Sequence, residues 1–292
     1  MAIHSAVGSM LSKYPDKTAN GQTNALKEII QQVALLGLFR VGFFDKAAFY
    51  GGTALRLFYG LPRFSEDLDF SLVKKSTNFS LAPFCAYVKT ELLAYGFDAE
   101  VMPKEKSVAT GIQSAFIKAG TLRNLLEIGA VRPSLIGVHS GELLKIKLEV
   151  DADPPAGATY EIKYLLEPIP FSVRIFSLPS LFAGKVHALL CRNWKGGRVK
   201  GRDLYDFVWY ISKKVSLDTA HLANRMRQTG HCGTHQFLRR PDILKVLNKK
   251  FQSINYAQAR QDIMPFIKNP DEVKVWSAEF FSAIAESLNT TN

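Results

Sequence analysis

The sequence is poor in cysteine, in long apolar runs and in repeated or low-complexity segments. Its 292 residues include 3 cysteines, Cys85, Cys191 and Cys232. An odd number of scattered cysteines fits reduced thiols rather than a disulfide framework. No apolar stretch approaches the length of a membrane span, and the N-terminus lacks the charged-then-apolar order of a signal peptide. We therefore expect a cytoplasmic protein with no membrane partner.

Acidic residues are also scarce relative to basic ones. The chain has 37 Lys and Arg against 26 Asp and Glu, which gives a net charge of +11. Clustered cations of this kind favour a polyanionic partner such as nucleic acid, because binding releases counterions. A basic surface that only keeps the protein in solution is the alternative. The hydrophobic share of 47% is ordinary for a soluble globular chain, long enough for one large domain or two modest ones.

The most informative stretch runs from Tyr50 to Ser71 and reads YGGTALRLFYGLPRFSEDLDFS. The pair Gly51–Gly52 precedes an expected helix, whose first N–H groups and dipole favour an anion. Asp67 and Asp69 follow on a strand-like run, where residues two apart face the same side. Paired carboxylates suit a hard cation such as Mg²⁺, which often shares its coordination with substrate phosphates. A phosphate cradle beside such a pair is the minimum apparatus for nucleotidyl transfer, although an isolated Asp-x-Asp triplet is more often a solvated turn.

A second strand-like run, LKIKLEVD, alternates strictly. Its apolar residues are expected to face the core, while the opposite face carries Lys145, Lys147, Glu149 and Asp151. The two acidic residues at its end therefore share the polar face. Taken by itself, such a face is the solvent-exposed side of an amphipathic strand.

Further along, Lys185 to Arg202 contains six Lys and Arg and no acidic residue. Three glycines make its second half a flexible loop. The next helix is expected to open with Arg202-Asp203-Leu204-Tyr205-Asp206, which places Asp203 and Asp206 on one face. We interpret the basic residues of the loop as contacts for nucleic acid: Lys195, Arg198, Lys200 and Arg202. A solvated loop is the alternative.

These motifs together resemble the nucleotidyltransferase family of AbiEii-type toxins, including the MenT-like enzymes, within the DNA polymerase β superfamily. The resemblance is carried by Gly51–Leu55, Tyr59, Leu61, Arg63–Phe70, Ala183-Gly184-Lys185 and the RDLYD run. It covers roughly residues 48–210. Many relatives have an acidic residue where this sequence has Gly184, a departure that leaves Lys185 in register.

The resemblance implies a fold and a division of the chain. We expect an α/β (α+β) fold with a mixed sheet, in which residues 1–40 form an arm and a helix. Residues 41–176 form the nucleotidyltransferase domain, and residues 177–292 form a helical C-terminal domain. Residues 1–21 are expected to be a loosely held arm, and residues 171–175 an edge strand.

The resemblance also implies an activity. We expect in-line attack of an acceptor hydroxyl on the α-phosphate of an NTP, with two Mg²⁺ ions that Mn²⁺ can replace. The acceptor is expected to be the 3′ end of tRNA, and the protein a toxin neutralised by an antitoxin from a neighbouring gene. Two alternatives are a non-catalytic module that binds GTP and an enzyme that nucleotidylates protein hydroxyls.

Roles for individual residues follow from the same resemblance. The catalytic residues are expected to be Asp67, Asp69, Glu149, Lys185 and Asp203. The metal ligands among them are Asp67, Asp69 and Glu149, with Asp151 as the alternative to Glu149. The nucleotide is expected to contact Gly51, Gly52, Thr53, Arg63, Ser65, Lys185 and Arg192. Asp203 either orients Lys185 or contacts the nucleotide.

One further pattern, His231-Cys232-x-x-His235, contains zinc-ligand residue types. Only three ligands lie there, and no fourth follows at a usual spacing. We therefore expect a surface turn rather than a metal clip.

Overall fold

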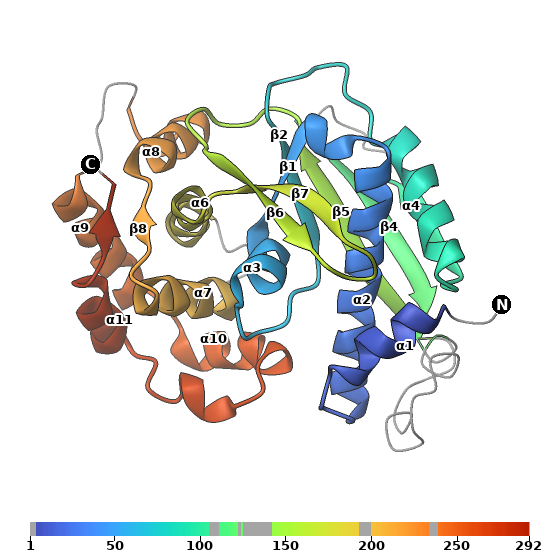
Figure 1. Cartoon of the computed structure of the whole chain (residues 1–292). Helices are drawn as coiled ribbons and strands as arrows, with labels where there is room; N and C mark the ends of the chain where they lie inside the picture. The colour runs from blue at the N-terminus through green and yellow to red at the C-terminus, as the bar shows by residue number, and fades with distance from the viewer. Residues whose placement is uncertain are drawn as a thin grey trace. The chain divides into compact units, whose positions relative to one another are not determined.

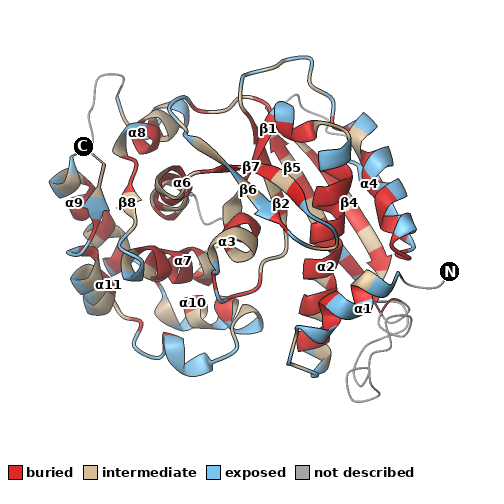
Figure 2. Ribbon diagram, viewed as in Figure 1, coloured by how far each residue is buried: buried red, intermediate tan, exposed pale blue. Residues whose placement is uncertain are grey.

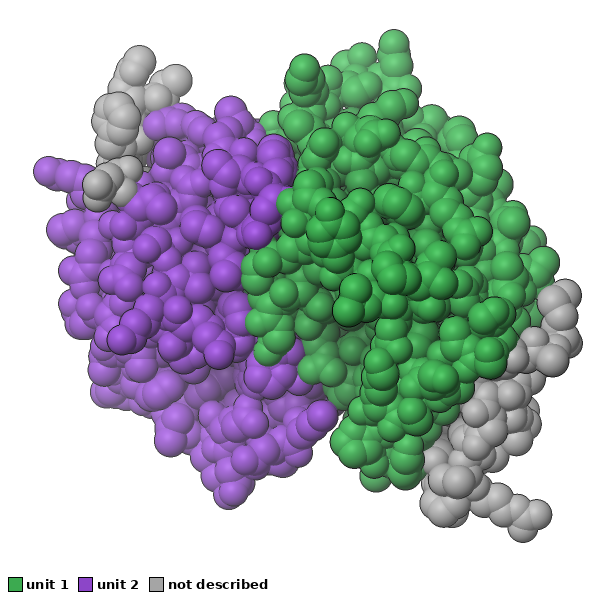
Figure 3. Space-filling view, viewed as in Figure 1, with its two compact units in different colours: residues 1–60, 64–154, 162–175 green, residues 61–63, 155–161, 176–292 purple. Residues whose placement is uncertain are grey.

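The computed structural model describes residues 4–104, 111–121, 124, 142–192, 200–233 and 239–291. The chain forms two compact units (Figure 3). Unit 1 contains residues 1–60, 64–154 and 162–175, and unit 2 contains residues 61–63, 155–161 and 176–292. The division into domains expected from the sequence stays a prediction, because compactness alone does not show that a segment folds independently.

A seven-stranded sheet with the order β3-β4-β5-β2-β1-β7-β6 forms the centre of unit 1 (Figure 1). Its strands are β1 (Ala47–Tyr50), β2 (Leu68–Leu72), β3 (Ala99–Pro103), β4 (Ile112–Gly120), β5 (Leu143–Asp151), β6 (Tyr160–Leu165) and β7 (Phe171–Phe176). β2 runs antiparallel to β1 but parallel to β5, and β4 runs antiparallel to β3 and β5. The expected mixed sheet is confirmed.

The prediction that residues 171–175 form an edge strand is wrong. β7 lies between β1 and β6, and β6 is the edge. β6 could not be predicted from the sequence, because its residues lack a continuous apolar face. Ile162 and Tyr164 are 52% and 69% exposed, as suits an edge strand whose outer face meets water.

The helices of unit 1 are α1 (Ser5–Ser12), α2 (Ala19–Arg40), α3 (Gly51–Tyr59) and α4 (Ala82–Ala94), and a 3₁₀ turn at Phe43–Asp45 precedes β1. α2 packs against α1 and α4 and is buried over most of its length (Figure 2). The expected loose arm at residues 1–21 is wrong, because α1 buries Val7 and Met10 and α2 already begins at Ala19. Helix α1 was not predicted because it is only 8 residues long and buries only Val7, Met10 and Leu11.

Alternate residues of β2 face the hydrophobic core and the opposite side of the sheet. Leu68 and Phe70 are buried in the main hydrophobic core, where Phe70 lies 5.0 Å from the rings of both Phe43 and Phe49. Asp69, between them in sequence, is only half-buried. The core side chains therefore anchor the strand that presents Asp69 on the opposite face.

Unit 2 is mainly helical, as expected for this part of the chain. Its elements are α6 (Leu178–Cys191), α7 (Gly201–Ser212), α8 (Thr219–Gln228), α9 (Arg240–Gln252), α10 (Tyr256–Ile263) and α11 (Ala278–Ala285), two 3₁₀ turns at Met264–Phe266 and Pro270–Val273, and a short parallel pair, β8 (Ser216–Leu217) with β9 (Asn289–Thr290). Aromatic contacts join its helices: Phe182 stacks on Tyr210, and Phe207 lies 5.6 Å from Phe251. Within the described residues, no helix has the length and apolar character needed to cross a membrane.

Candidate active site

The acidic residues of unit 1 meet on one face of the sheet. Asp69 of β2 pairs in register with Glu149 of β5, and Ser114 of β4 pairs with Glu149 from the other side. Side chains of residues paired across neighbouring strands project to the same face. Asp69 and Glu149 are therefore adjacent, and Asp67 lies immediately before β2.

The position of Glu149 distinguishes it from Asp151. The carboxylate of Glu149 accepts a hydrogen bond from Ser114 Oγ at 3.1 Å and pairs with Lys147 Nζ at 2.7 Å. Asp151 pairs instead with Ser71, and its Oδ1 accepts the backbone N–H of Asp153 at 2.9 Å. Asp151 therefore shapes the turn after β5, while Glu149 stands beside Asp69. The sequence analysis placed Lys147 on this face but assigned it no role.

The glycine turn lies directly against the acidic pair. Gly51 opens α3 with a φ of +86°, a conformation that favours glycine, and a Cβ at this position would collide with the Asp69 carboxylate. Thr53 is buried, and its hydroxyl donates to the backbone carbonyl of Asp67. Thr53 thus ties α3 to the start of β2 instead of presenting an open hydroxyl to a phosphate. Ser65 is half-buried, and its carbonyl accepts from Gln31 Nε2 at 3.1 Å.

This donor set fits a hard divalent cation. Asp67, Asp69 and Glu149 offer carboxylate oxygens, the ligand type that Mg²⁺ prefers. Because Gly51 has no side chain, the Asp69 carboxylate can lie directly against the start of α3.

A cleft of about 390 Å³ opens beside Asp67 in unit 1. Its lining includes Lys27, Glu66, Phe116, Lys145 and Lys147. Lys145 Nζ lies 4.2 Å from the centre of the Phe116 ring, and Lys27 pairs with Glu66 at 3.1 Å. The carboxylate face of the sheet thus continues into a cleft of mixed charge, because Glu66, Asp67 and Glu142 line it together with the three lysines.

A separate cluster of charges lies inside unit 2. Asp203 and Asp206 project from α7 and are almost fully buried. Lys185 Nζ of α6 lies 3.3 Å from Asp203 Oδ1 and 2.7 Å from Asp206 Oδ2. Arg192 Nη1 lies 2.8 Å from Asp203 Oδ2. Of the two roles expected for Asp203, the contact with Lys185 is therefore present.

Arg63 requires a correction. Its side chain is 2% exposed, and its Nε and Nη2 donate to the two Asp206 oxygens at 2.6 and 2.7 Å. The expected phosphate contact of Arg63 conflicts with this burial, because both arms of the guanidinium are held in the interior of unit 2. Asp206 is the partner that sequence reasoning missed, although its spacing from Asp203 indicated a shared helix face.

The buried ion pair between Arg63 and Asp206 shifts the pKa of both groups. Burial alone would raise the pKa of Asp206, but the charges of Arg63 and Lys185 outweigh it and hold that pKa below its usual range. Burial would also lower the pKa of Arg63, but the negative charge of Asp206 outweighs burial and raises that pKa. Both groups are therefore charged at neutral pH.

The sequence over residues 33–284 matches the family model described as "Nucleotidyl transferase AbiEii toxin, Type IV TA system". This chain belongs to the AbiEii nucleotidyl transferase toxin family. It is accordingly a nucleotidyltransferase enzyme, the toxin of a type IV toxin–antitoxin system, with an NTP substrate and an antitoxin partner.

Two solved structures are similar to this AbiEii-family chain. JHP933 from Helicobacter pylori is 18% identical, with 90% of each chain covered and a TM-score of 0.48. An antigenic nucleotidyltransferase-like protein from Paracoccidioides brasiliensis is 18% identical over 75% of this chain and 91% of its own, with a TM-score of 0.37. The search of curated proteins found no match.

The basic residues expected to bind nucleic acid in this toxin divide into two pairs. Lys195 and Arg198 lie outside the described residues. Lys200 immediately precedes α7, and the Arg202 guanidinium lies 4.4 Å from the centre of the Phe266 ring. Arg202 therefore packs on unit 2 through a cation–π contact.

Proposed function

We propose that this toxin transfers a nucleoside monophosphate from an NTP to the 3′ hydroxyl of tRNA in a Mg²⁺-dependent reaction. The observation that carries the proposal is the pairing of Asp69 with Glu149 in register, directly against the Gly51 turn. This arrangement combines a carboxylate ligand set with the first N–H groups of a helix, the two elements that bind the metal and the phosphates of a nucleoside triphosphate.

Each part of this site has a defined task in the proposal. Asp67, Asp69 and Glu149 hold the metal, with Mn²⁺ as a substitute for Mg²⁺. Two bound ions would stabilise the charge on the attacking and leaving oxygens. Glu149 also assists removal of the proton from the acceptor hydroxyl. The new bond joins that oxygen to the α-phosphorus, the bond to the bridging oxygen breaks, and pyrophosphate leaves.

The remaining residues bind and neutralise phosphates. The N–H groups of Gly51 and Gly52 at the start of α3 bind the terminal phosphates, and Ser65 contributes nearby. Lys185 and Arg192 neutralise charge on the pyrophosphate, and Asp203 keeps Lys185 oriented through its ion pair. Thr53 acts by holding the backbone of Asp67.

An RNA acceptor is favoured by the cations beside Glu149. Lys145 and Lys147 lie on the same strand face as this carboxylate and line the cleft beside Asp67. Together with Lys195, Arg198 and Lys200 they supply contacts to phosphates, which position a nucleic acid without selecting its sequence.

The test offers each radiolabelled NTP separately to the protein with Mg²⁺ and, in parallel, tRNA, other RNA or total protein. We expect label in tRNA, release of pyrophosphate, and loss of both with EDTA or in Asp69→Asn. Label in protein would favour nucleotidylation of protein hydroxyls. Retention of GTP without release of pyrophosphate would favour a non-catalytic module, and a fully active Asp69→Asn variant would overturn the metal assignment.

A further inference from the structure

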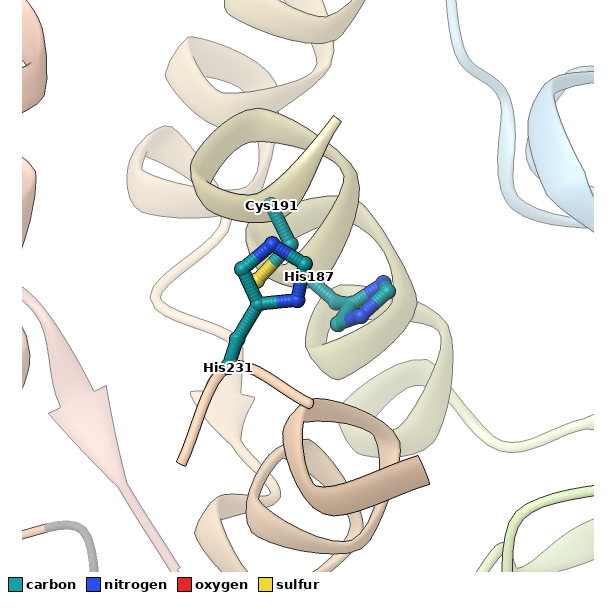
Figure 4. Close-up of side chains that lie close together, drawn as sticks. All are labelled: His187, Cys191 and His231. Atoms are coloured by element: carbon teal, nitrogen blue, oxygen red, sulfur yellow. The ribbon is translucent and has the colours of Figure 1, made fainter. Parts of the chain in front are cut away.

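His187, Cys191 and His231 form a cluster of metal-ligand side chains in unit 2 (Figure 4). His187 and Cys191 lie four residues apart on α6, so they project from one face of the helix. His231 follows the end of α8 and brings its ring to the same place. One ligand atom from each residue lies within 4.8 Å of the other two.

The backbone that carries His231 is well defined. The N–H of His231 donates to the Met226 carbonyl at 2.8 Å, and Gly230 has a φ of +72°. This arrangement is the usual way in which a glycine ends a helix. Because α6 packs against α8, the helix end holds His231 over the His187 face of α6.

Thr229 brings the two imidazoles together. His187 Nε2 and His231 Nδ1 each lie 2.9 Å from Thr229 Oγ1. Both ring nitrogens therefore hydrogen-bond to the Thr229 hydroxyl, with the Cys191 thiol beside them, and an ion bound between the three side chains would replace these two hydrogen bonds. Zinc with ligands at about 2.0–2.3 Å places its donor atoms roughly 3.3–3.8 Å apart. Small rotations of the side chains therefore suffice to close the cluster.

The chemistry of the cluster selects the metal. Two imidazoles and one thiol are nitrogen and sulfur donors, which suit zinc and not magnesium. Burial lowers the pKa of His187 to about 4, so its ring is neutral at pH 7. Arg225 also lowers the pKa of His187. Burial raises the pKa of the Cys191 thiol to about 11, so the bound zinc itself would have to drive loss of the thiol proton, as metals do for coordinating thiols.

We propose that His187, Cys191 and His231 bind one zinc ion that fastens the C-terminal end of α6 to the turn after α8. Binding replaces the Cys191 S–H bond with a sulfur–zinc bond and releases the proton to water. The fourth position is taken by water, because the Cys232 thiol donates instead to the Ala223 carbonyl at 3.6 Å. The pattern around His231 predicts a surface turn because the other two ligands, His187 and Cys191, lie far away in sequence on α6. His235 lies outside the described residues.

Zinc bound at this site would also affect the ion pair between Arg192 and Asp203. Cys191 immediately precedes Arg192, which pairs with Asp203. A metal bound at the last turn of α6 would therefore restrict the backbone that carries Arg192. This inference does not depend on the proposed acceptor or on the Mg²⁺ site.

The test titrates chelator-treated, full-length protein with Co²⁺ as a spectroscopic probe. We expect one equivalent to produce visible d–d bands and a near-ultraviolet thiolate band, both removed by Zn²⁺. His231→Ala changes a surface ring and should weaken Co²⁺ affinity by about 100-fold or more, since even loss of an outer-shell partner costs 10–100-fold. Cys191→Ser should abolish the thiolate band.

Cys85→Ala is the matched control, because it removes a buried thiol of unit 1 and should leave the spectrum unchanged. Circular dichroism should show each variant folded. A wild-type titration with no thiolate band, or a His231→Ala spectrum equal to that of wild type, would overturn the proposal.

Discussion

At the scale of single residues, Gly51 links the phosphate cradle to the carboxylates. Its positive φ suits glycine, and its missing side chain allows the Asp69 carboxylate to lie against the turn. Gly60, at the other end of the same helix, has a φ of +74° but nothing within 4 Å of an added Cβ. The two glycines therefore share a backbone requirement and differ in what surrounds them.

We predict that Gly51→Ala and Gly60→Ala each cost about 1–2 kcal/mol of stability, from the left-handed conformation. Gly51→Ala should also lower nucleotidyl transfer by about 100-fold, because the methyl group displaces Asp69 and misplaced groups lose about that much rate. Gly60→Ala should retain transfer. Thermal melts and initial rates measure the two effects, and equal activities in the two variants would contradict the role of Gly51.

At the scale of elements, β5 carries two carboxylates on one face in different surroundings. Glu149 stands beside Asp69, while Asp151 accepts a backbone N–H from the following turn. The alternating pattern of the strand makes both residues candidates. The residues paired with them on β2 distinguish the two, because Glu149 pairs with Asp69 and Asp151 pairs with Ser71.

We predict that Glu149→Gln lowers kcat by about 10²–10⁴-fold, the usual range for loss of a group that moves a proton. The affinity for NTP should change little, because the amide keeps the shape of the side chain. Asp151→Asn should keep most of the turnover and lose some stability. Single-turnover rates measure the loss of turnover, and equilibrium binding of NTP measures the affinity. A Glu149→Gln variant as active as wild type would assign the role of proton acceptor to Asp151 instead.

At the scale of the whole molecule, a basic chain keeps Asp203 and Asp206 among the buried residues of unit 2. Asp206 is fully buried and holds Arg63 and Lys185 by short ion pairs. The partner Arg63 is 143 positions away in sequence. Such a network stabilises only while every member is charged, because an unmatched buried charge is costly.

We predict that Asp206→Asn costs about 3–5 kcal/mol at pH 7, the usual effect of leaving a buried charge without its partner. The folded-state pKa of Asp206 is depressed, so its contribution is present above the unfolded value of about 4 and is lost as pH falls through the folded value. Urea unfolding from pH 7 to pH 2 should therefore show that the free energy of unfolding falls less with acid in the variant than in wild type. Identical pH slopes would contradict the charged state of Asp206.

Local periodicity was enough to predict most of the elements around the site. The two glycines before α3, the Asp-x-Asp spacing of β2 and the strict alternation of β5 each depend on residues close in sequence. The edge strand β6 and helix α1 were missed because β6 lacks a clean apolar face and α1 is short. The mixed sheet could also be predicted, through the family that these motifs resemble.

Only the tertiary structure decided which distant residues meet. Parallel pairing of β2 with β5 sets Glu149 beside Asp69, and a register shift of two residues would have chosen Asp151. Packing of separate segments also buries Arg63 against Asp206 and joins His231 to α6. Sequence periods report which face of an element a residue occupies, whereas strand register and helix packing set the neighbours of that face.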